Sequence, residues 1–366
     1  MHRVETVVVG AGVVGLAVAR ALAQAGREVL VLDSADDIGT GVSARSSEVI
    51  HAGLYYAPGS LKAVLCVAGK AQLYAYCDAH AVGHRRCGKL LVAADASEWV
   101  QLERIRDTAA ENGVLDLQAL TQSEAADLEP ALRCAGAMRS PSTGIVDSHG
   151  LMLAYLGDLE DAGGVFARAC RVAGADVIPT GFSVRIAGEA EPLHCRELIN
   201  AAGLGAIPLA RQIDGVPSDT VPDAYFAKGQ YFRCSARTPF SQLIYPVPQP
   251  GGLGIHLTLD LDGQARFGPD VHWVTAPEYG VDPATAPDFE AAIRRYWPAL
   301  PEGSLRPDYA GVRPKIVGPG EVAADFQIAG PTHHGVRGYV GLYGIESPGL
   351  TASLAIGAHV EDVLHD

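Results

Sequence analysis

The chain has 366 residues, of which 48% are hydrophobic and 19% are charged, and its formal net charge is −14. The composition is that of a globular enzyme, and the length exceeds what one hydrophobic core commonly supports, so we expect two connected domains. The acidic charge argues against nucleic acid or an anionic membrane as a main partner. The scattered cysteines contain no C-x-x-C pair, which favours reduced thiols, and no metal-ligand spacing predicts a metal site.

The first residues of the chain allow two interpretations. A basic tip followed by an apolar run is a property of signal peptides. Glu5 interrupts this run, however, and a glycine pattern and a second apolar segment follow it. We therefore interpret the region as a strand over 6–9 and a helix over 13–25. The run before Arg20 is also too short to cross a membrane. These features predict a cytoplasmic protein without an integral membrane segment.

A dinucleotide-binding signature lies where this strand meets the helix. Gly10, Gly12 and Gly15 form the pattern G-x-G-x-x-G, and a second strand over 27–33 ends on Asp33. The glycines permit a tight turn, a close approach of the backbone to a pyrophosphate, and close packing of helix on strand. The helix N-terminus attracts the phosphates, and Asp33 is placed to accept hydrogen bonds from a ribose. The cofactor-binding candidates of this unit are Gly10, Gly12, Val14, Gly15, Asp33 and Ser34.

The signature by itself does not distinguish NAD from FAD. A NAD-binding domain is expected to continue with another strand–helix unit, whereas residues 36–60 are rich in Gly, Ser and Arg. Such a segment suits FAD, because this extended cofactor needs hydrogen-bond donors beyond the first turn. We therefore predict FAD as the cofactor, and a NAD-dependent dehydrogenase is an alternative.

The later elements complete an α/β fold, α+β overall. Helical patterns with solvated faces or capping signals lie over 58–80, 97–113, 121–130, 147–164 and 286–300. Strand patterns lie over 88–94, 165–172, 228–234, 242–248, 252–263 and 264–270, with a hairpin turn at Asp262 and Gly263. The expected architecture is a discontinuous Rossmann-like FAD-binding domain, over 1–75, 145–205 and 305–366. A substrate domain with a mainly antiparallel sheet is expected over 76–144 and 206–304.

Motifs along nearly the whole chain are similar to those of a known group of enzymes. They are "SARSSEVIHAGLYYAPGSLKAVLCVAGKAQLYAYC", "CGKLLVA", "TGIVDSHGLM", "NAAGL", "KGQYF", "YPVP", "GIHLTLDLDGQARFGPD", "AGVRPK" and "GIESPGLTASLAIG". The chain thereby resembles the L-2-hydroxyglutarate dehydrogenase/oxidase group of the D-amino-acid-oxidase-type family of FAD-dependent oxidoreductases. The resemblance implies oxidation of a small anionic substrate at FAD.

The resemblance also implies where the cofactor lies. Donors to the pyrophosphate side are expected from Ser43, Arg45 and Ser46. Close approach to the isoalloxazine is expected next to His51, at Ala52, Gly53 and Leu54. Val172 is the candidate for the adenine, and Ala202 and Gly203 form a turn beside the pyrophosphate.

The C-terminal motif is expected to begin a helix, with Ser347 as its cap and Pro348 in its first turn. The helix N-terminus would face the part of the flavin that becomes negative on reduction. The candidates here are Gly344, Ile345, Glu346, Ser347, Gly349, Leu350 and Thr351.

The resemblance implies that Arg313 in "AGVRP" binds the substrate carboxylate, and the planar fork of an arginine suits bidentate binding. Gly311 and Arg313 are also expected to contact the cofactor. A surface arginine that pairs with Asp308 is the alternative. Lys228 or Arg45 are candidates for a second acid group, although Lys228 could equally be a solvated lysine. The predicted pocket liners are Gln230, Tyr245 and Tyr56.

Two histidines, His256 and His51, are the candidates for the base that takes the hydroxyl proton, since imidazole titrates near neutral pH. The predicted reaction is oxidation of a 2-hydroxy acid, L-2-hydroxyglutarate above all, to the 2-oxo acid, with hydride transfer to flavin N5. Alternatives on the same scaffold are an amino or imino acid or glycerol phosphate as substrate, or a flavin-binding protein without turnover. Oxygen, a quinone or another flavoprotein could accept the electrons.

Overall fold

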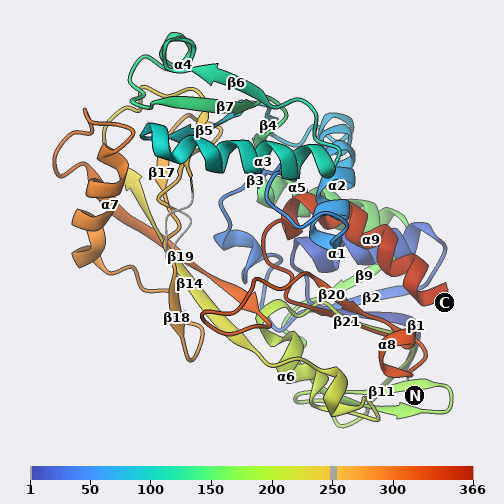
Figure 1. The fold of residues 1–366 in the computed structure, drawn as a ribbon. Helices are drawn as coiled ribbons and strands as arrows, with labels where there is room; N and C mark the ends of the chain where they lie inside the picture. The colour runs from blue at the N-terminus through green and yellow to red at the C-terminus, as the bar shows by residue number, and fades with distance from the viewer. Residues whose placement is uncertain (1, 248–253, 366) are drawn as a thin grey trace.

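The computed structural model of the protein describes residues 2–247 and 254–365 (Figure 1). Two of the predicted strands therefore extend outside the described residues, one at residue 248 and the other at residues 252–253. The described residues form two large sheets, each with a hydrophobic core, and one small sheet, and a bundle of helices packs on the first large sheet.

The first sheet contains the strand of the glycine signature. Its strands follow the order β13-β10-β11-β12-β1-β2-β9, and β21, which pairs with β12, adds β20. β1 pairs in parallel with both β2 and β12. The strands are β1 (His2–Val9), β2 (Val29–Leu32), β9 (Val165–Ala167), β10 (Val172–Ile178), β11 (Gly181–Ile186), β12 (Leu193–Asn200), β13 (Ile213–Asp214), β20 (Gln327–Ala329) and β21 (Tyr339–Tyr343).

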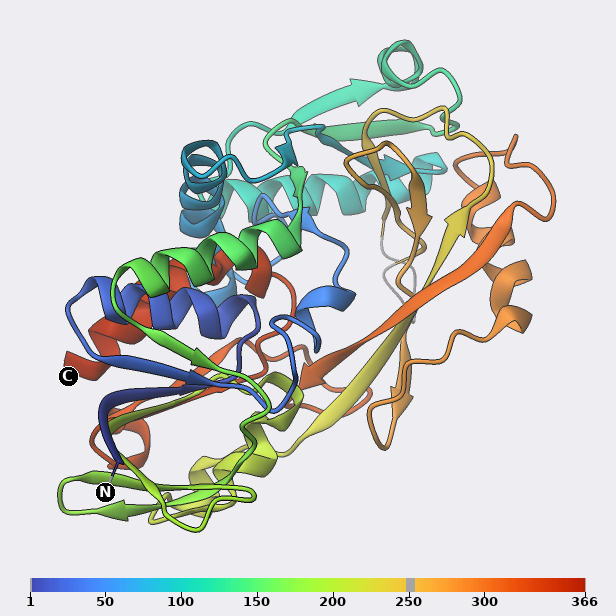
Figure 2. The ribbon, with the colours of Figure 1, turned by 180° about the vertical axis from the view of Figure 1, so that it is seen from behind.

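Long helices cover one face of this sheet, as Figures 1 and 2 show from opposite sides. They are α1 (Val13–Gln24), α2 (Leu61–Ala79), α5 (Ser148–Asp161) and α9 (Gly349–His365). Val8, Val31 and Ile199 of the sheet pack with Leu16 of α1 and Ile356 of α9 in one buried cluster. The glycine turn and the start of α9 therefore lie on the same side of the molecule.

The second sheet follows the order β18-β14-β17-β16-β15-β5-β7-β6, and β19 pairs antiparallel with β14. β14 and β19 are the long strands that run between the two halves in Figures 1 and 2. The strands are β5 (Lys89–Ala93), β6 (Gln118–Thr121), β7 (Gly136–Ser140), β14 (Tyr225–Cys234), β15 (Leu243–Pro246), β16 (Leu257–Leu259), β17 (Ala265–Phe267), β18 (His272–Val274) and β19 (Leu305–Lys315). Phe232, Phe267 and Phe289 belong to its core.

Shorter elements connect the two halves. Three small strands form a separate sheet: β3 (Val49–Ile50), β8 (Gly144–Val146) and β4 (His84–Arg85). The remaining α-helices are α3 (Trp99–Glu111), α4 (Gln122–Leu128), α6 (Ala206–Ala210), α7 (Ala286–Arg294) and α8 (Pro331–His334). Short 3₁₀ helices cover Ser43–Arg45, Ala96–Glu98, Gly203–Gly205, Ser218–Thr220 and Pro283–Thr285.

Local sequence signals determine where several of these elements begin and end. Thr121 and Glu124 form both hydrogen bonds of the predicted capping box at α4. Ser60 caps α2 by accepting a hydrogen bond from the N–H of Ala63, at 3.2 Å. Gly26 follows α1 with a φ of 90°, a conformation that glycine adopts without strain. The mixed α/β fold that the sequence predicts is confirmed.

Strand pairing differs from the predicted domain boundaries at two segments. β19 was assigned with the FAD-binding domain, but it pairs with β14 in the second sheet. β13 was assigned with the substrate domain, but it pairs with β10 in the first sheet. Among the helices of the described residues, none has the length and apolar character that crossing a membrane requires.

Candidate active site

A cavity of about 440 Å³ lies between the two sheets. Its wall combines the glycine turn, residues 39–49 and His51, the turn at 201–204, parts of β14 and β19, and the start of α9. The sequence predicts that the segment after the nucleotide signature runs along the cofactor site. The position of residues from this segment in the cavity wall is consistent with that prediction. Gly39, Thr40 and Val42 also line the cavity, although no quoted motif contains them. Ser47 and Glu48 line it too, and they lie within the motif "SARSSEVIHAG" without being among the predicted site residues.

The glycine turn forms one end of the cavity. A Cβ atom at Gly15 would lie 1.9 Å from the carbonyl oxygen of Gly10, and one at Gly10 would lie 2.5 Å from that of Ala201. The hydroxyl of Ser43 accepts a hydrogen bond from the N–H of Val13, at 2.9 Å. Gly12 faces this hydroxyl, since its own Cβ would lie 3.0 Å away. The backbone of the turn and the first residues of α1 thus line the cavity. This arrangement suits the binding of a pyrophosphate.

Asp33, Ser34 and Val172 lie outside the cavity wall. The carboxylate of Asp33 accepts hydrogen bonds from the N–H groups of Ala11, at 2.7 Å, and Ala35, at 2.9 Å. It therefore holds the glycine turn in place. The segment before Val172 is adjacent, because the N–H of Cys170 donates to the carbonyl of Asp33 at 2.7 Å. Ala202 and Gly203 both line the cavity.

The segment after Ser43 divides into a cavity-lining part and a core part. Arg45, Ser46 and His51 line the cavity. Ala52 and Leu54, by contrast, are buried in the core of the second sheet. Gly53 has a φ of 98°, and a Cβ there would lie 2.7 Å from the side chain of Val67. Packing on α2 thus accounts for this glycine.

Tyr56 is not part of the cavity wall, although the sequence predicted it as a pocket liner. Its carbonyl accepts a hydrogen bond from Asn112, at 2.9 Å.

Gly203, which does line the cavity, has a φ of 57°.

The start of α9 forms the wall beside His51. Gly349, Leu350 and Thr351 line the cavity, as do Ile345, Glu346 and Ser347, whereas Gly344 packs on Ile316. α9 begins at Gly349, slightly later than predicted.

The polar side chains at this helix start are engaged with their neighbours. The hydroxyl of Ser347, the predicted cap, lies 3.3 Å from Nε2 of His51. The hydroxyl of Thr351 accepts a hydrogen bond from the N–H of His51, at 3.0 Å. Glu346 accepts hydrogen bonds from Lys62, at 2.9 Å, and Lys315, at 2.8 Å.

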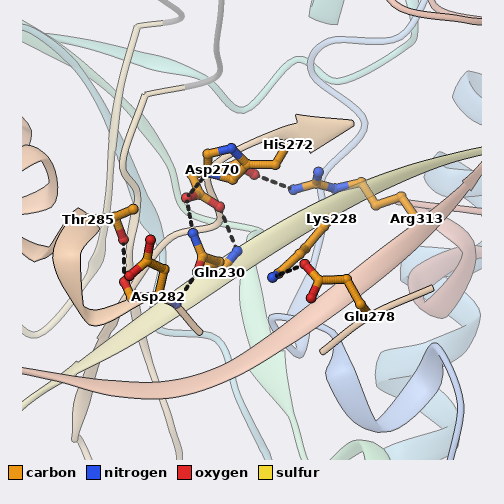
Figure 3. Close-up of polar contacts among 8 residues, drawn as sticks. All are labelled: Lys228, Gln230, Asp270, His272, Glu278, Asp282, Thr285 and Arg313. Carbon is orange, nitrogen blue, oxygen red and sulfur yellow. Dashed lines mark hydrogen bonds and ion pairs between the residues drawn. The ribbon is translucent and has the colours of Figure 1, made fainter. Parts of the chain in front are cut away.

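Alternation along β14 separates the residues that face the cavity from those that do not. Gly229 and Tyr231 line the cavity, but Lys228 and Gln230 do not. Figure 3 shows Lys228 paired with Glu278, and Gln230 with Asp270. Gln230 donates from its backbone N–H and its side-chain amide to the Asp270 carboxylate, at 2.6 and 2.9 Å.

Lys228, a candidate for binding a second acid group, and Gln230, a predicted pocket liner, therefore have protein partners on the side of β14 that faces away from the cavity. Tyr231 was missed by the sequence analysis. Alternate residues of a strand face the same side, so Tyr231 faces the cavity together with Gly229, two residues before it.

Arg313 lines the cavity from β19. One of its terminal nitrogens donates to the carbonyl of Asp270, at 3.2 Å (Figure 3). In the described part of the chain Arg313 forms no salt bridge, and the alternative partner Asp308 is paired with Arg266 at 2.8 Å. Gly311 approaches the backbone of Arg45 closely, since a Cβ on it would lie 2.5 Å from the Arg45 carbonyl oxygen.

Arg45 differs from Arg313 in having an aromatic partner. Its guanidinium carbon lies 4.2 Å from the ring centroid of Tyr279. Arg313 is thus the cavity arginine that presents its charge without an ion pair or an aromatic cover among the described residues.

The two candidate bases both line the cavity. His256 stacks on Tyr245, with ring centroids 3.7 Å apart and planes 10° apart. Burial, together with the charges of Lys89 and His256, lowers the pKa of His51 to about 3. His51 is therefore neutral at ordinary pH. No group of side chains that could hold a metal ion occurs among the described residues.

The sequence of the chain is similar to those of named enzymes. A family model described as FAD dependent oxidoreductase matches residues 5–363. The chain is 43% identical to the L-2-hydroxyglutarate dehydrogenase, mitochondrial, of Arabidopsis thaliana, over 98% of this chain and 83% of that protein. It is 27% identical to the L-2-hydroxyglutarate dehydrogenase of Salmonella houtenae, over 97% of this chain and 92% of that protein.

Solved structures show the same fold. The L-alpha-glycerophosphate oxidase of Mycoplasma pneumoniae, with FAD bound, has a TM-score of 0.90 at 22% identity, over 100% of this chain and 96% of that one. The glycine oxidase of Geobacillus kaustophilus has a TM-score of 0.85 at 20% identity, over 100% and 95%. The glycine cradle and the long cavity that continues from it fit FAD, and the chain belongs to the FAD dependent oxidoreductase family.

Proposed function

We propose that the protein oxidises a small 2-hydroxy acid to the corresponding 2-oxo acid, with L-2-hydroxyglutarate as its substrate. The observation that carries this proposal is the guanidinium of Arg313, which lines the cavity without a carboxylate partner among the described residues and on the same wall as His256. Support for the substrate comes from the relatives named L-2-hydroxyglutarate dehydrogenase, one of them 43% identical.

The residues that would hold FAD lie along one wall. The turn at Gly10, Gly12 and Gly15 would hold the pyrophosphate, and the start of α9 would face the flavin. FAD, when bound, supplies the acceptor for the hydride that leaves C2 of the substrate. Glu346, held by Lys62 and Lys315, fixes the backbone at the start of α9.

Arg313 would bind the substrate carboxylate, because its planar fork matches the two oxygens. The carbonyl of Asp270 occupies one N–H of that fork and so orients it. The hydroxyl proton of the substrate needs a protein base. We assign this role to His256, because its ring is fixed against Tyr245, whereas the surroundings of His51 disfavour the imidazolium.

The test is anaerobic reduction of the flavin by L-2-hydroxyglutarate. The loss of flavin absorbance measures this reduction. Arg313→Ala should raise the apparent substrate Kd by at least about tenfold, the loss expected for a charge-assisted hydrogen bond. FAD content should stay at the wild-type level. Arg306→Ala, an exposed arginine on the same strand, serves as the matched control. Absence of flavin reduction by any 2-hydroxy acid, or normal turnover by Arg313→Ala, would refute the assignment.

A further inference from the structure

Lys89 is a buried lysine that lies within the motif "CGKLLVA" but was not among the predicted site residues. It begins β5, its side chain is 0% exposed, and its Nζ has no hydrogen-bond partner among the described residues. The Nζ instead lies 4.5 Å from the ring centroid of Tyr245 and 5.0 Å from that of Tyr55. Two aromatic rings therefore cover the ammonium group.

The sheet places Lys89 next to the cavity wall. β5 pairs in parallel with β15, with Lys89 opposite Leu243 and Leu91 opposite Tyr245. Alternate residues of a strand face the same side, so Lys89 and Tyr245 share one face of the sheet. Tyr245 lines the cavity and stacks on His256. The ammonium thus lies against a ring that itself lines the cavity and stacks on His256.

No carboxylate among the described residues forms a salt bridge with Lys89. The lysine salt bridges of the described residues involve Lys62, Lys228 and Lys315, but not Lys89. Burial lowers the pKa of Lys89 to about 7. After burial, Lys89 is the largest cause of the lowered pKa of His51. Lys89 therefore acts electrostatically on a group that lines the cavity.

An unpaired buried ammonium is costly, because water no longer solvates it. A negative group at the cavity end formed by His51, Tyr245 and His256 would offset this cost. The interaction does not need direct contact, since charges separated by several ångströms still interact strongly where water is excluded. The other candidates for a second acid group are engaged elsewhere, because Lys228 pairs with Glu278 and Arg45 stacks on Tyr279.

We propose that Lys89 is a specificity-determining residue whose charge favours substrates that carry a second carboxylate. That carboxylate lies at the cavity end formed by His51, Tyr245 and His256, while Arg313 binds the carboxylate next to the reacting carbon. The inference rests on the proposed function for the identity of the substrate. It extends that function by assigning the selection of dicarboxylates to a residue that does not contact the reacting atoms.

The experiment measures binding without turnover. The FAD-loaded protein is titrated with glutarate and with pentanoate, which have the same chain length and differ in the second carboxylate, and the flavin absorption change gives each Kd. Wild type should bind glutarate about ten- to hundredfold more tightly than pentanoate. Lys89→Met and Lys89→Gln should remove this preference and leave the Kd of pentanoate unchanged. Lys89→Arg, which keeps the charge, should retain it.

Lys70→Met is the matched control, because Lys70 donates to Ser142 and lies outside the cavity wall. It should behave as wild type. Equal Kd values for glutarate and pentanoate in wild type would overturn the proposal, whatever the variants do. Equal weakening of both ligands in Lys89→Met and Lys89→Gln would also overturn it, since that result indicates a structural role. Failure of the proposed function is a separate outcome, seen as no flavin reduction by 2-hydroxy acids while the glutarate preference persists.

Discussion

His51 and His256 face the same cavity, and the surroundings of His51 disfavour a proton on its ring. The pKa of His51 is lowered to about 3, so this ring stays neutral throughout the pH range from 5 to 9. Hydrogen-bonded contacts with Ser347 and Thr351 tie it to the start of α9. Such a weak base is poorly matched to the proton of a hydroxyl group. Its position suits it to hold the helix start in place.

His256→Asn should lower the rate of flavin reduction by L-2-hydroxyglutarate by about 10²- to 10⁴-fold, the usual contribution of a general base. His51→Asn should lower it by a smaller factor. Anaerobic stopped-flow absorbance measures both rates, with FAD content as the control for correct assembly. Between pH 5 and 9 the profiles of wild type and His51→Asn should bend at the same pH, because His51 does not titrate there. A greater loss in His51→Asn than in His256→Asn would contradict the assignment of the base.

Single residues were predictable where their backbone role is local. Gly10, Gly12 and Gly15 have the positions that their spacing requires, because a tight turn leaves no room for a Cβ. For Lys228 and Tyr231 the two-residue period of the strand predicts only that they face opposite sides, and not which side lines the cavity. The face that each presents depends on the pairing of β14 with β19, whose register shifts between Gln230 and Phe232. Lys89 was inside a recognised motif, but only the neighbouring strand brings it to Tyr245.

At the scale of elements, the contact between α2 and α9 determines where the cavity wall lies. Gly69 of α2 packs directly on the first turn of α9. A Cβ atom there would lie 2.5 Å from the carbonyl oxygen of Thr351 and 2.8 Å from the Cα of Ala352. These are backbone atoms, which cannot move aside as a flexible side chain can. Because Thr351 also lines the cavity, a displaced helix would change the site.

Gly69→Ala should therefore lower the free energy of unfolding by about 1–3 kcal/mol, as overpacking of a core does. It should also weaken FAD binding. Gly157→Ala is the control, because Gly157 lies within α5 and a Cβ there would meet nothing within 4 Å. That variant should be stabilised by about 0.5–1 kcal/mol, since alanine restricts the unfolded chain. Denaturant unfolding and FAD titration measure the two effects, and equal behaviour of both variants would rule out the packing argument.

Elements could be predicted from sequence to the extent that their ends carry local signals. The capping box of Thr121 and Glu124 begins α4 within its predicted range 121–130, and Ser60 caps α2 within the predicted range 58–80. The sheet to which a strand belongs carries no such signal. β19 pairs with β14, and β13 pairs with β10, although each partner is distant in sequence. This non-local pairing places both strands in a different sheet from the one that the predicted domain ranges imply.

At the scale of the whole molecule, the two halves have separate cores that meet at the cavity. One core joins the helices to the first sheet, and the other lies on the second sheet. β14 and β19 run between the halves (Figure 2). The cavity wall draws on both sheets, with Gly10 and Ala202 from one side and Tyr231 and Arg313 from the other. A cofactor in this cavity would thus contact both halves at once.

Removal of FAD should consequently destabilise the cavity wall, where the two halves meet, more than it destabilises either hydrophobic core. A ligand at about 100 times its Kd stabilises the folded state by about 2.7 kcal/mol, so the Tm of the apoprotein should fall and recover with added FAD. Hydrogen exchange, followed by mass spectrometry, should rise in the segments 39–51 and 345–351, which contribute residues to the cavity wall. It should change little in β1 and β12, whose pairing belongs to the first core. Increased exchange in β1 and β12 equal to that at the junction would show that FAD supports the whole fold rather than the contact between its halves.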